Sequence, residues 1–329
     1  MTRYRVACLD VWSDAVRAEV RRNAPAEFEL SFASSYEPGH QQELAAGADF
    51  AVPGFAAIDQ ALVDRAPRLR MVQKWGIGID AIDQDALRRR GIGLGIAAGC
   101  NAGPVAELAI ALMLAVYRRI PYVNREMRNG AWPTPEMRET CFQITGKTVG
   151  LLGLGHIGRM LARRLSGFDA RIVYFDPRRC DAAVEAELKA TWRPLDDVLA
   201  TSDIVSLHLP LNETTTRLIR AETIARMKPG AVLINTARGG LVDEGALADA
   251  LRSGHLRGAG LDAFDQEPPS SDNPLFGFDQ VVVTPHAGGG VFDNVAPVAR
   301  HVFGNLMRHV RGEALPPGDL ILPATGAAT

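Results

Sequence analysis

An apolar run leads directly into a glycine-rich turn in the segment Val149-Gly150-Leu151-Leu152-Gly153-Leu154-Gly155-His156-Ile157-Gly158. An amphipathic stretch follows at 160–165, so the turn has the strand–turn–helix context that a dinucleotide-binding motif requires. In that motif Gly153 permits the tight turn, Gly155 lets the backbone approach a pyrophosphate, and Gly158 allows close helix–strand packing. A GxGxxG turn alone can also be purely structural, so the residues that follow it decide between the two interpretations.

The next apolar run, at 171–175, ends at Asp176. A carboxylate at this place accepts hydrogen bonds from ribose hydroxyls and repels a 2′-phosphate, which favours NAD over NADP. Arg178 and Arg179 follow, and they form either a solvated basic loop or a site for that phosphate. We therefore predict NAD as the cofactor, with NADP less favoured. The candidate cofactor-binding residues here are Gly153, Gly155, His156, Ile157, Gly158 and Asp176.

Short apolar runs alternate with amphipathic stretches on both sides of this segment, which predicts strands alternating with helices. Before Asn101 we expect strands near 4–9, 28–33, 49–52, 70–74 and 93–96, and a helix from Asp80 to Arg90. Pro104 opens a long helical pattern that reaches about Arg128. The second series predicts strands near 148–152, 171–175, 203–207, 231–235, 259–263 and 281–284.

The length of 329 residues is enough for about two domains. The two series predict an α/β protein with two doubly wound parallel sheets, a flavodoxin-like substrate-binding domain and a Rossmann dinucleotide-binding domain. We expect the first domain to be discontinuous, with residues 1–101 and 298–329, where a C-terminal helix returns to it. Residues 102–297 would form the dinucleotide-binding domain.

The composition argues against several other classes of protein. A net charge of −2 without a run of Lys and Arg gives no reason to expect nucleic acid as a partner. The four cysteines lack metal-ligand spacing, so we expect free thiols and no metal site. The longest uncharged apolar stretch, 108–117, is far too short to cross a bilayer, and the N-terminus does not resemble a signal peptide. We therefore expect a cytoplasmic protein.

Several further motifs resemble the signatures of the D-isomer-specific 2-hydroxyacid dehydrogenases. Together with the glycine turn they span nearly the whole chain, and their order makes them more specific than any one motif. The resemblance implies hydride transfer between NAD(H) and a 2-oxo acid/D-2-hydroxy acid pair. The motifs are Gly76-Ile77-Gly78-Ile79-Asp80, Asn101-Ala102-Gly103-Pro104-Val105-Ala106-Glu107-Leu108, Asn235-Thr236-Ala237-Arg238-Gly239-Gly240-Leu241-Val242-Asp243, Leu261-Asp262-Ala263-Phe264-Asp265-Gln266-Glu267-Pro268 and Thr284-Pro285-His286.

Three residues in these motifs resemble the catalytic residues of the family. Arg238 resembles the guanidinium that grips the substrate carboxylate and polarises the ketone. His286 resembles the acid/base that exchanges the proton, and Glu267 resembles the carboxylate that favours the protonated imidazole and orients it. Each has a structural alternative as well: a surface ion pair, the end of a strand and a turn histidine.

The resemblance also implies binding roles for other residues. Backbone N–H groups of Ile77 and Gly78 would hold the substrate carboxylate, as would Arg238. Asp262 would lie near the nicotinamide carboxamide or serve only as an acid at the end of a strand, and Ala237 is a further candidate for cofactor binding. His208 matches a segment on the adenosine side, although a structural role fits it equally well.

Departures from the family pattern narrow the substrate. The loop 52–56 carries no cation for a substrate phosphate, and Glu267 stands where formate-oxidising relatives have an amide. Phe55 and Trp75 favour a substrate with an apolar or small side chain, whereas Lys74 reaches either a second acidic group or solvent. We expect a non-phosphorylated 2-oxo acid, either glyoxylate- or hydroxypyruvate-like or apolar. As in the family, the apolar helix from Pro104 favours a homodimer.

Three alternatives remain beside this interpretation. One is an NAD(H)-sensing protein similar to the corepressors that resemble this family, which would need a partner-binding groove. Another is an enzyme similar to phosphoglycerate dehydrogenase. A Rossmann methyltransferase is the third, but the third glycine, Asp176 and the Arg/Glu/His set argue against it.

Overall fold

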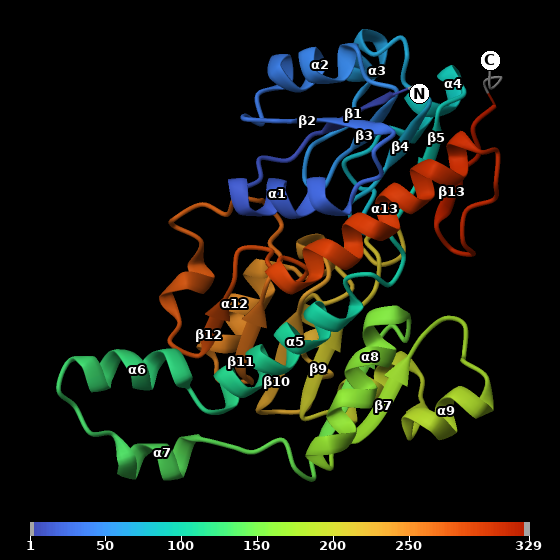
Figure 1. Cartoon of the computed structure of the whole chain (residues 1–329). Helices are drawn as coiled ribbons and strands as arrows, with labels where there is room; N and C mark the ends of the chain where they lie inside the picture. Colours follow the sequence, from blue (N-terminus) through green and yellow to red (C-terminus); the bar gives the residue numbers. More distant parts are fainter. Residues whose placement is uncertain (1–2, 326–329) are drawn as a thin grey trace. The chain divides into compact units, whose positions relative to one another are not determined.

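The computed structural model of the chain describes residues 3–325, and these form two compact units (Figure 1). The first comprises the described residues up to Asn101 together with those from Val291 onward, and the second is Ala102–Gly290. From the sequence, the return to the first unit is expected at about residue 298. The return lies earlier because a short turn, η4 (Phe292–Asn294), runs directly into helix α13 (Val295–Val310), whose buried face packs in the first unit's core.

The first unit contains a six-stranded sheet in the order β13-β5-β4-β3-β1-β2. Its five predicted strands are parallel and follow the order of flavodoxin-like folds, which confirms that part of the fold prediction. β13 was not predicted, and it makes the sheet mixed because it pairs antiparallel with β5. Prolines lie on both sides of its three residues, and its partner strand lies more than two hundred residues earlier, so no local pattern indicated it. The strands are β1 (Tyr4–Cys8), β2 (Phe28–Phe32), β3 (Phe50–Val52), β4 (Met71–Gln73), β5 (Gly93–Gly95) and β13 (Leu320–Leu322).

Helix α4 (Gln84–Arg90) shows how a capping residue sets the start of a helix in this unit. We predicted a helix from Asp80, but the carboxylate of Asp83 accepts the N–H of Ala86 at 2.9 Å and caps the helix there. The helix ends, as predicted, before Gly91, which has a φ of 65°. Besides α4 and α13, the first unit contains α1 (Asp14–Asn23), α2 (Pro38–Ala46) and α3 (Gln60–Arg65).

The second unit contains a fully parallel seven-stranded sheet in the order β12-β11-β10-β9-β6-β7-β8. This is the Rossmann order with one strand added beyond the sixth, which confirms the predicted fold class. The edge strand β8 was missed because only the first of its three residues is buried, so no apolar run indicates it. The strands are β6 (Thr148–Leu152), β7 (Arg171–Phe175), β8 (Ala190–Trp192), β9 (Ile204–Leu207), β10 (Ala231–Asn235), β11 (Leu256–Leu261) and β12 (Val281–Val283).

Helices cover both faces of this sheet (Figure 1). Apolar residues of α5, α8 and α9 pack on one face, and those of α10, α11 and α12 pack on the other. β6 is buried along its whole length between them, so the glycine turn that follows it starts from a rigid position. The bounds are α5 (Ala102–Tyr117), α8 (His156–Leu165), α9 (Ala182–Leu188), α10 (Leu195–Thr201), α11 (Ala221–Ile224) and α12 (Glu244–Arg252).

The long helix predicted from Pro104 to Arg128 is two helices. After α5 the backbone breaks at Arg119, which has a left-handed φ of 50°, and α6 (Ile120–Arg128) begins. α7 (Thr134–Thr140) follows within the proline-containing segment. Sequence periodicity did not reveal the break because one non-glycine residue in this conformation leaves no pattern in the hydrophobic positions.

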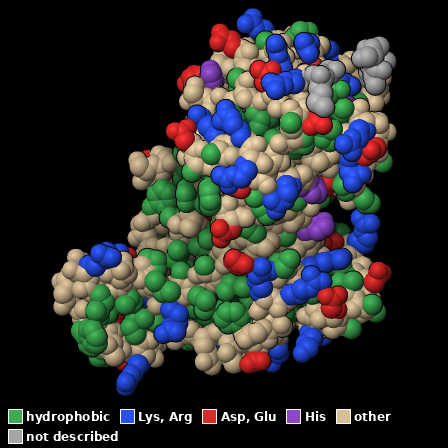
Figure 2. All heavy atoms as spheres, viewed as in Figure 1, with side chains coloured by type: hydrophobic (Ala, Val, Ile, Leu, Met, Phe, Trp, Pro, Cys, Tyr) green, Lys and Arg blue, Asp and Glu red, His purple; other side chains and the backbone are tan. Residues whose placement is uncertain are grey.

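The surface carries charges of both signs. Figure 2 shows lysines and arginines interspersed with acidic side chains over the visible face. Among residues 3–325 no helix combines the length and apolar character needed to cross a membrane.

Candidate active site

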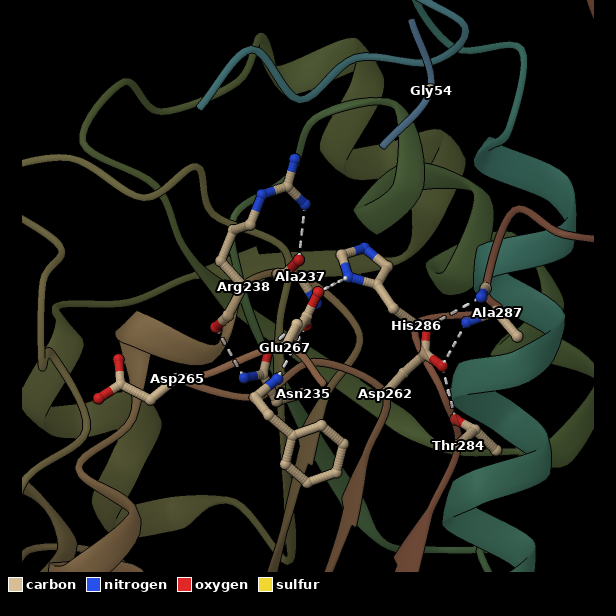
Figure 3. Close-up of polar contacts among 12 residues, drawn as sticks. Gly54, Asn235, Ala237, Arg238, Asp262, Asp265, Glu267, Thr284, His286 and Ala287 are labelled. Atoms are coloured by element: carbon tan, nitrogen blue, oxygen red, sulfur yellow. Dashed lines mark hydrogen bonds and ion pairs between the residues drawn. The ribbon is translucent and has the colours of Figure 1, made fainter. Parts of the chain in front are cut away.

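The three predicted catalytic residues follow three neighbouring strands of the second unit. The parallel registers place Asn235 beside Leu261 and Leu261 beside Val283, so β10, β11 and β12 end level with one another. Arg238, Glu267 and His286 follow these ends, and Figure 3 shows their side chains grouped together. Residues far apart in the chain meet here because the carboxyl ends of parallel strands share one edge of the sheet.

The side chains of His286 and Glu267 are in direct hydrogen-bonding contact. Nδ1 of His286 lies 2.7 Å from Oε2 of Glu267, and their side chains are 30% and 34% exposed. The other carboxylate oxygen accepts the backbone N–H of Phe264 at 3.0 Å, which anchors Glu267. With a carboxylate as its partner, Nδ1 carries a proton, so proton exchange with a substrate would use Nε2.

The charge state of Glu267 follows from opposing effects. Burial raises the pKa of this carboxyl, but the hydrogen bonds from His286 and Phe264 and the positive charges of His286 and Arg238 outweigh it. The pKa of Glu267 therefore lies below its usual value. The carboxylate is ionised at neutral pH and can stabilise a positive imidazolium beside it.

The backbone turn of Arg238 is held by Asn235, the last residue of β10. Nδ2 of Asn235 donates to the carbonyl of Arg238 at 2.8 Å, and its Oδ1 accepts the N–H of Ala237 at 3.0 Å. The guanidinium of Arg238 donates to the carbonyl of Ala237 at 2.7 Å. Gly239 follows because any Cβ there would overlap the backbone of Phe264. Sequence analysis missed Asn235 as a site residue, although a buried polar residue at a strand end could have indicated it.

The glycine turn has the backbone geometry of a dinucleotide cradle. Gly153 has a φ of 99°, and a Cβ there would lie 2.5 Å from the carbonyl oxygen of His208. A Cβ on Gly158 would lie 2.3 Å from the carbonyl oxygen of Gly153, whereas the space beside Gly155 is open. Gly155 is also the N-cap of α8, so the helix's first N–H groups face that opening. These residues fit a pyrophosphate group.

Asp176 lies beside this turn. Its Oδ2 accepts the N–H of Leu154 at 3.0 Å, and its Oδ1 accepts the N–H of Arg178 at 3.1 Å. Arg179 makes two hydrogen bonds of 2.8 Å to Glu185, and this contact, together with that from Tyr174, lowers the pKa of Glu185 to about 2. Of the two arginines that could hold a 2′-phosphate, Arg179 is thus already engaged by an acid.

His208 directly follows β9 and is partly buried. Burial lowers the pKa of its imidazole to about 4, so the ring is neutral at physiological pH. Nε2 contacts the hydroxyl of Ser206 at 2.9 Å, while the backbone carbonyl of His208 packs on Gly153. Both observations favour the structural role that the sequence left open for this residue.

The predicted substrate loop belongs to the first unit. Ile77 and Gly78 lie between β4 and α4, after Gly76 with a φ of 125°, and both are partly exposed. Trp75 packs against Trp12 with ring centroids 4.8 Å apart. The meeting of Ile77 and Gly78 with Arg238 stays a prediction.

The position of Lys74 changes the charge expected at the loop 52–56. Its side chain does not reach into solvent but is buried, and Nζ donates to the carbonyl of Gly54. The loop 52–56 therefore has a cation beside it after all. Asp10 lies at the same loop and accepts the N–H of Phe55 at 2.6 Å. Burial raises the pKa of Asp10. Hydrogen bonds from the backbone of residues 54–56 and the positive charge of Lys74 offset part of this rise.

Comparison with known proteins identifies the family of this chain. Residues 110–288, more than half of the chain, match the family model described as "D-isomer specific 2-hydroxyacid dehydrogenase, NAD binding domain". The chain belongs to this family. The match covers most of the second unit, which is therefore the NAD-binding domain of a family member, and the Rossmann methyltransferase alternative is wrong.

Curated relatives and solved structures extend the likeness to most of the chain. D-3-phosphoglycerate dehydrogenase of Mycobacterium tuberculosis is 41% identical over 259 residues, which are 79% of this chain and 48% of that protein. Glyoxylate reductase of Korarchaeum cryptofilum is 40% identical over 262 residues, covering 79% of this chain and 78% of that protein. The TT0316 protein from Thermus thermophilus superposes with a TM-score of 0.84 at 32% identity, covering 97% and 100% of the two chains. The family member thus spans about half the length of the phosphoglycerate dehydrogenases it matches.

Proposed function

We propose that this family member is an NAD-dependent D-2-hydroxyacid dehydrogenase that interconverts a 2-oxo acid and a D-2-hydroxy acid. The observation that carries the proposal is the 2.7 Å pair of His286 and Glu267 beside Arg238, at the strand ends of an NAD-binding domain. An acid/base, its charged partner and a guanidinium are the groups that reduction of a ketone beside a carboxylate requires.

Each residue then has a defined task. Arg238 binds the substrate carboxylate and polarises the carbonyl oxygen with charged hydrogen bonds. Nε2 of His286 gives a proton to that oxygen during reduction and takes it back during oxidation. Glu267 holds the ring by Nδ1 and stabilises its positive form. Bound NADH supplies the hydride, and Gly153, Gly155, Gly158 and Asp176 would hold it, with His156, Ile157, Ala237 and Asp262 as the other candidate residues.

The carboxylate of Asp176 supports NAD over NADP, and its replacement tests this preference. We expect Asp176→Ala to lower the ratio of kcat/KM for NADH over NADPH about 10- to 100-fold, since charged hydrogen bonds to the ribose and repulsion of a phosphate are both lost. Asp176→Asn controls for the loop, because its amide oxygen can still accept a backbone N–H. An unchanged ratio in both variants would show that another residue selects the cofactor.

The pH dependence tests the Glu267 assignment. The lowered pKa of Glu267 keeps it ionised to below its ordinary value of about 4.3, so its own titration should leave no step between about pH 5 and 8. We expect Glu267→Gln to reduce kcat for reduction about 10- to 100-fold near neutral pH. Its activity should also decline with rising pH at a lower pH than in wild type, because the amide no longer favours the imidazolium. Profiles of log kcat against pH that run parallel would contradict the assignment.

We infer a small, non-phosphorylated 2-oxo acid as the substrate. Support comes from the relatives named glyoxylate reductase, which match this chain over more of their length than the phosphoglycerate dehydrogenases do. Lys74 beside the loop 52–56 weakens the charge argument against a phosphate, but Asp10 at the same loop balances it. NADH oxidation should be screened with glyoxylate, hydroxypyruvate, pyruvate, bulkier 2-oxo acids and 3-phosphohydroxypyruvate. Highest kcat/KM with the phosphorylated substrate would overturn this inference, and NADH binding without turnover would favour the NAD(H)-sensing alternative.

We further propose that the first unit, with Ile77 and Gly78, is the substrate-binding domain and that the protein is a homodimer. One side of α5 packs on β10 and β11, whereas Leu108, Ile110 and Leu114 are only partly buried, so the interface expected for this helix stays a prediction. Exposed apolar side chains lie farther along the predicted segment and just beyond it, at Ile120, Met127 and Trp132. Sedimentation of the wild type and of Trp132→Glu would test whether this surface joins two copies.

A further inference from the structure

Both oxygens of the Asp262 carboxylate are used within the loop that carries His286. Oδ1 accepts the hydroxyl of Thr284 at 2.6 Å and the backbone N–H of Ala287 at 2.8 Å, and Oδ2 accepts the N–H of Gly288 at 2.9 Å (Figure 3). The side chain is only 1% exposed. A buried carboxylate is stable only when such donors surround it, so this arrangement is a constructed site and not a chance surface contact.

The three donors flank His286 on both sides. Thr284 lies two residues before it, and Ala287 and Gly288 follow it directly. His286 itself has a φ of 52°, a left-handed conformation that a residue with a Cβ rarely adopts and that its surroundings must impose. Because Asp262 accepts hydrogen bonds from residues before and after His286, these contacts can impose the left-handed conformation of His286.

The neighbouring strands provide the alignment. β11 pairs with β12 so that Leu261 lies beside Val283, which brings the next residues, Asp262 and Thr284, side by side. Thr284 N also donates to the carbonyl of Leu261 at 2.9 Å, continuing the ladder. Gly288 fits because a Cβ there would lie 3.0 Å from Oδ2 of Asp262 and 3.3 Å from Val105.

We propose that Asp262 is a positioning residue for His286: its carboxylate holds the 284–288 turn in the one backbone conformation that directs the imidazole toward Glu267. Thr284 shares this role through its hydroxyl. This inference rests on the proposed function only where it speaks of turnover, since the conformation of the turn can be measured without a substrate. It assigns Asp262 a task in addition to the contact with the cofactor expected from the family resemblance.

Two nearly isosteric substitutions test the proposal. Asp262→Asn places an amide N–H against one of the donors, and Thr284→Val removes only the hydroxyl. We expect kcat for 2-oxo acid reduction to fall about 10- to 100-fold in Asp262→Asn and about 3- to 10-fold in Thr284→Val, with a changed pH profile in both. Asp249→Asn and Thr201→Val, at exposed sites on α12 and α10, are the matched controls and should behave as wild type.

A spectroscopic measurement keeps the test independent of the reaction. In protein with ¹⁵N-labelled histidine, both substitutions should shift or broaden the ring signals of His286. These signals are assigned by their absence from the spectrum of His286→Ala. If none of the 2-oxo acids supports NADH oxidation by the wild type, but these shifts still occur in the variants, the proposed function fails while the positioning role stands. If Asp262→Asn only raises the Kd for NADH while Thr284→Val leaves kcat, pH profile and ring signals unchanged, Asp262 is only a cofactor contact and the proposal is overturned.

Discussion

Replacing His286 with alanine is expected to lower kcat for 2-oxo acid reduction about 10²- to 10⁴-fold, the range that a positioned general acid contributes. The alkoxide formed by hydride transfer would then have to take its proton from water. The Kd for NADH, measured by fluorescence quenching, should change little, because the glycine turn and Asp176 lie at other strand ends. Single-turnover NADH oxidation at saturating substrate would separate the two quantities.

The control for this variant is His40→Ala, which removes a histidine from α2 in the first unit, where it contacts Ser34. It should retain wild-type kcat and Kd. If His286→Ala instead raised the Kd for NADH while kcat at saturating NADH stayed at the wild-type value, the imidazole would be a cofactor ligand and not the acid/base. Glu267→Gln should resemble a weaker form of His286→Ala, since it leaves the ring but removes its charged partner.

Replacing Arg238 with glutamine is expected to lower kcat/KM for the 2-oxo acid about 10²- to 10³-fold, comparable to the loss of one preorganised donor at a developing oxyanion. Both constants should change: KM rises because the carboxylate loses its charged partner, and kcat falls because the carbonyl is no longer polarised. Arg238→Lys should recover only part of the loss, since an ammonium cannot hold two groups in a planar fork. Steady-state kinetics at saturating NADH measures each effect.

Arg252→Gln is the matched control, because this arginine is exposed on α12 and pairs with Asp249. Its kinetic constants should equal those of the wild type. A loss in Arg238→Gln confined to the KM for NADH would remove Arg238 from substrate binding. The charge of Arg238 also lowers the pKa of Glu267, so the variant should shift the acid side of the pH profile upward.

Much of the second unit was predictable because its signals are local. The glycine turn, the acid after the second strand and the buried apolar runs each lie within a few residues, and local sterics and hydrophobic burial decide them. The same holds for the five parallel strands of the first sheet. Arg238, Glu267 and His286 could be singled out because each follows a strand whose end must lie at the same edge of the sheet.

The amino-acid sequence by itself thus determined the parallel strands of both sheets except the edge strand β8, the glycine turn at Gly153–Gly158 and the family of the protein. Only the tertiary structure decided what each polar side chain contacts. Lys74 turns inward to Gly54, and β13 pairs with a strand more than two hundred residues before it. The hydrogen bonds that Asp262 accepts from the 284–288 turn depend on the register of β11 and β12. These contacts depend on packing between distant segments, where burial makes each polar group find a partner that no local pattern specifies.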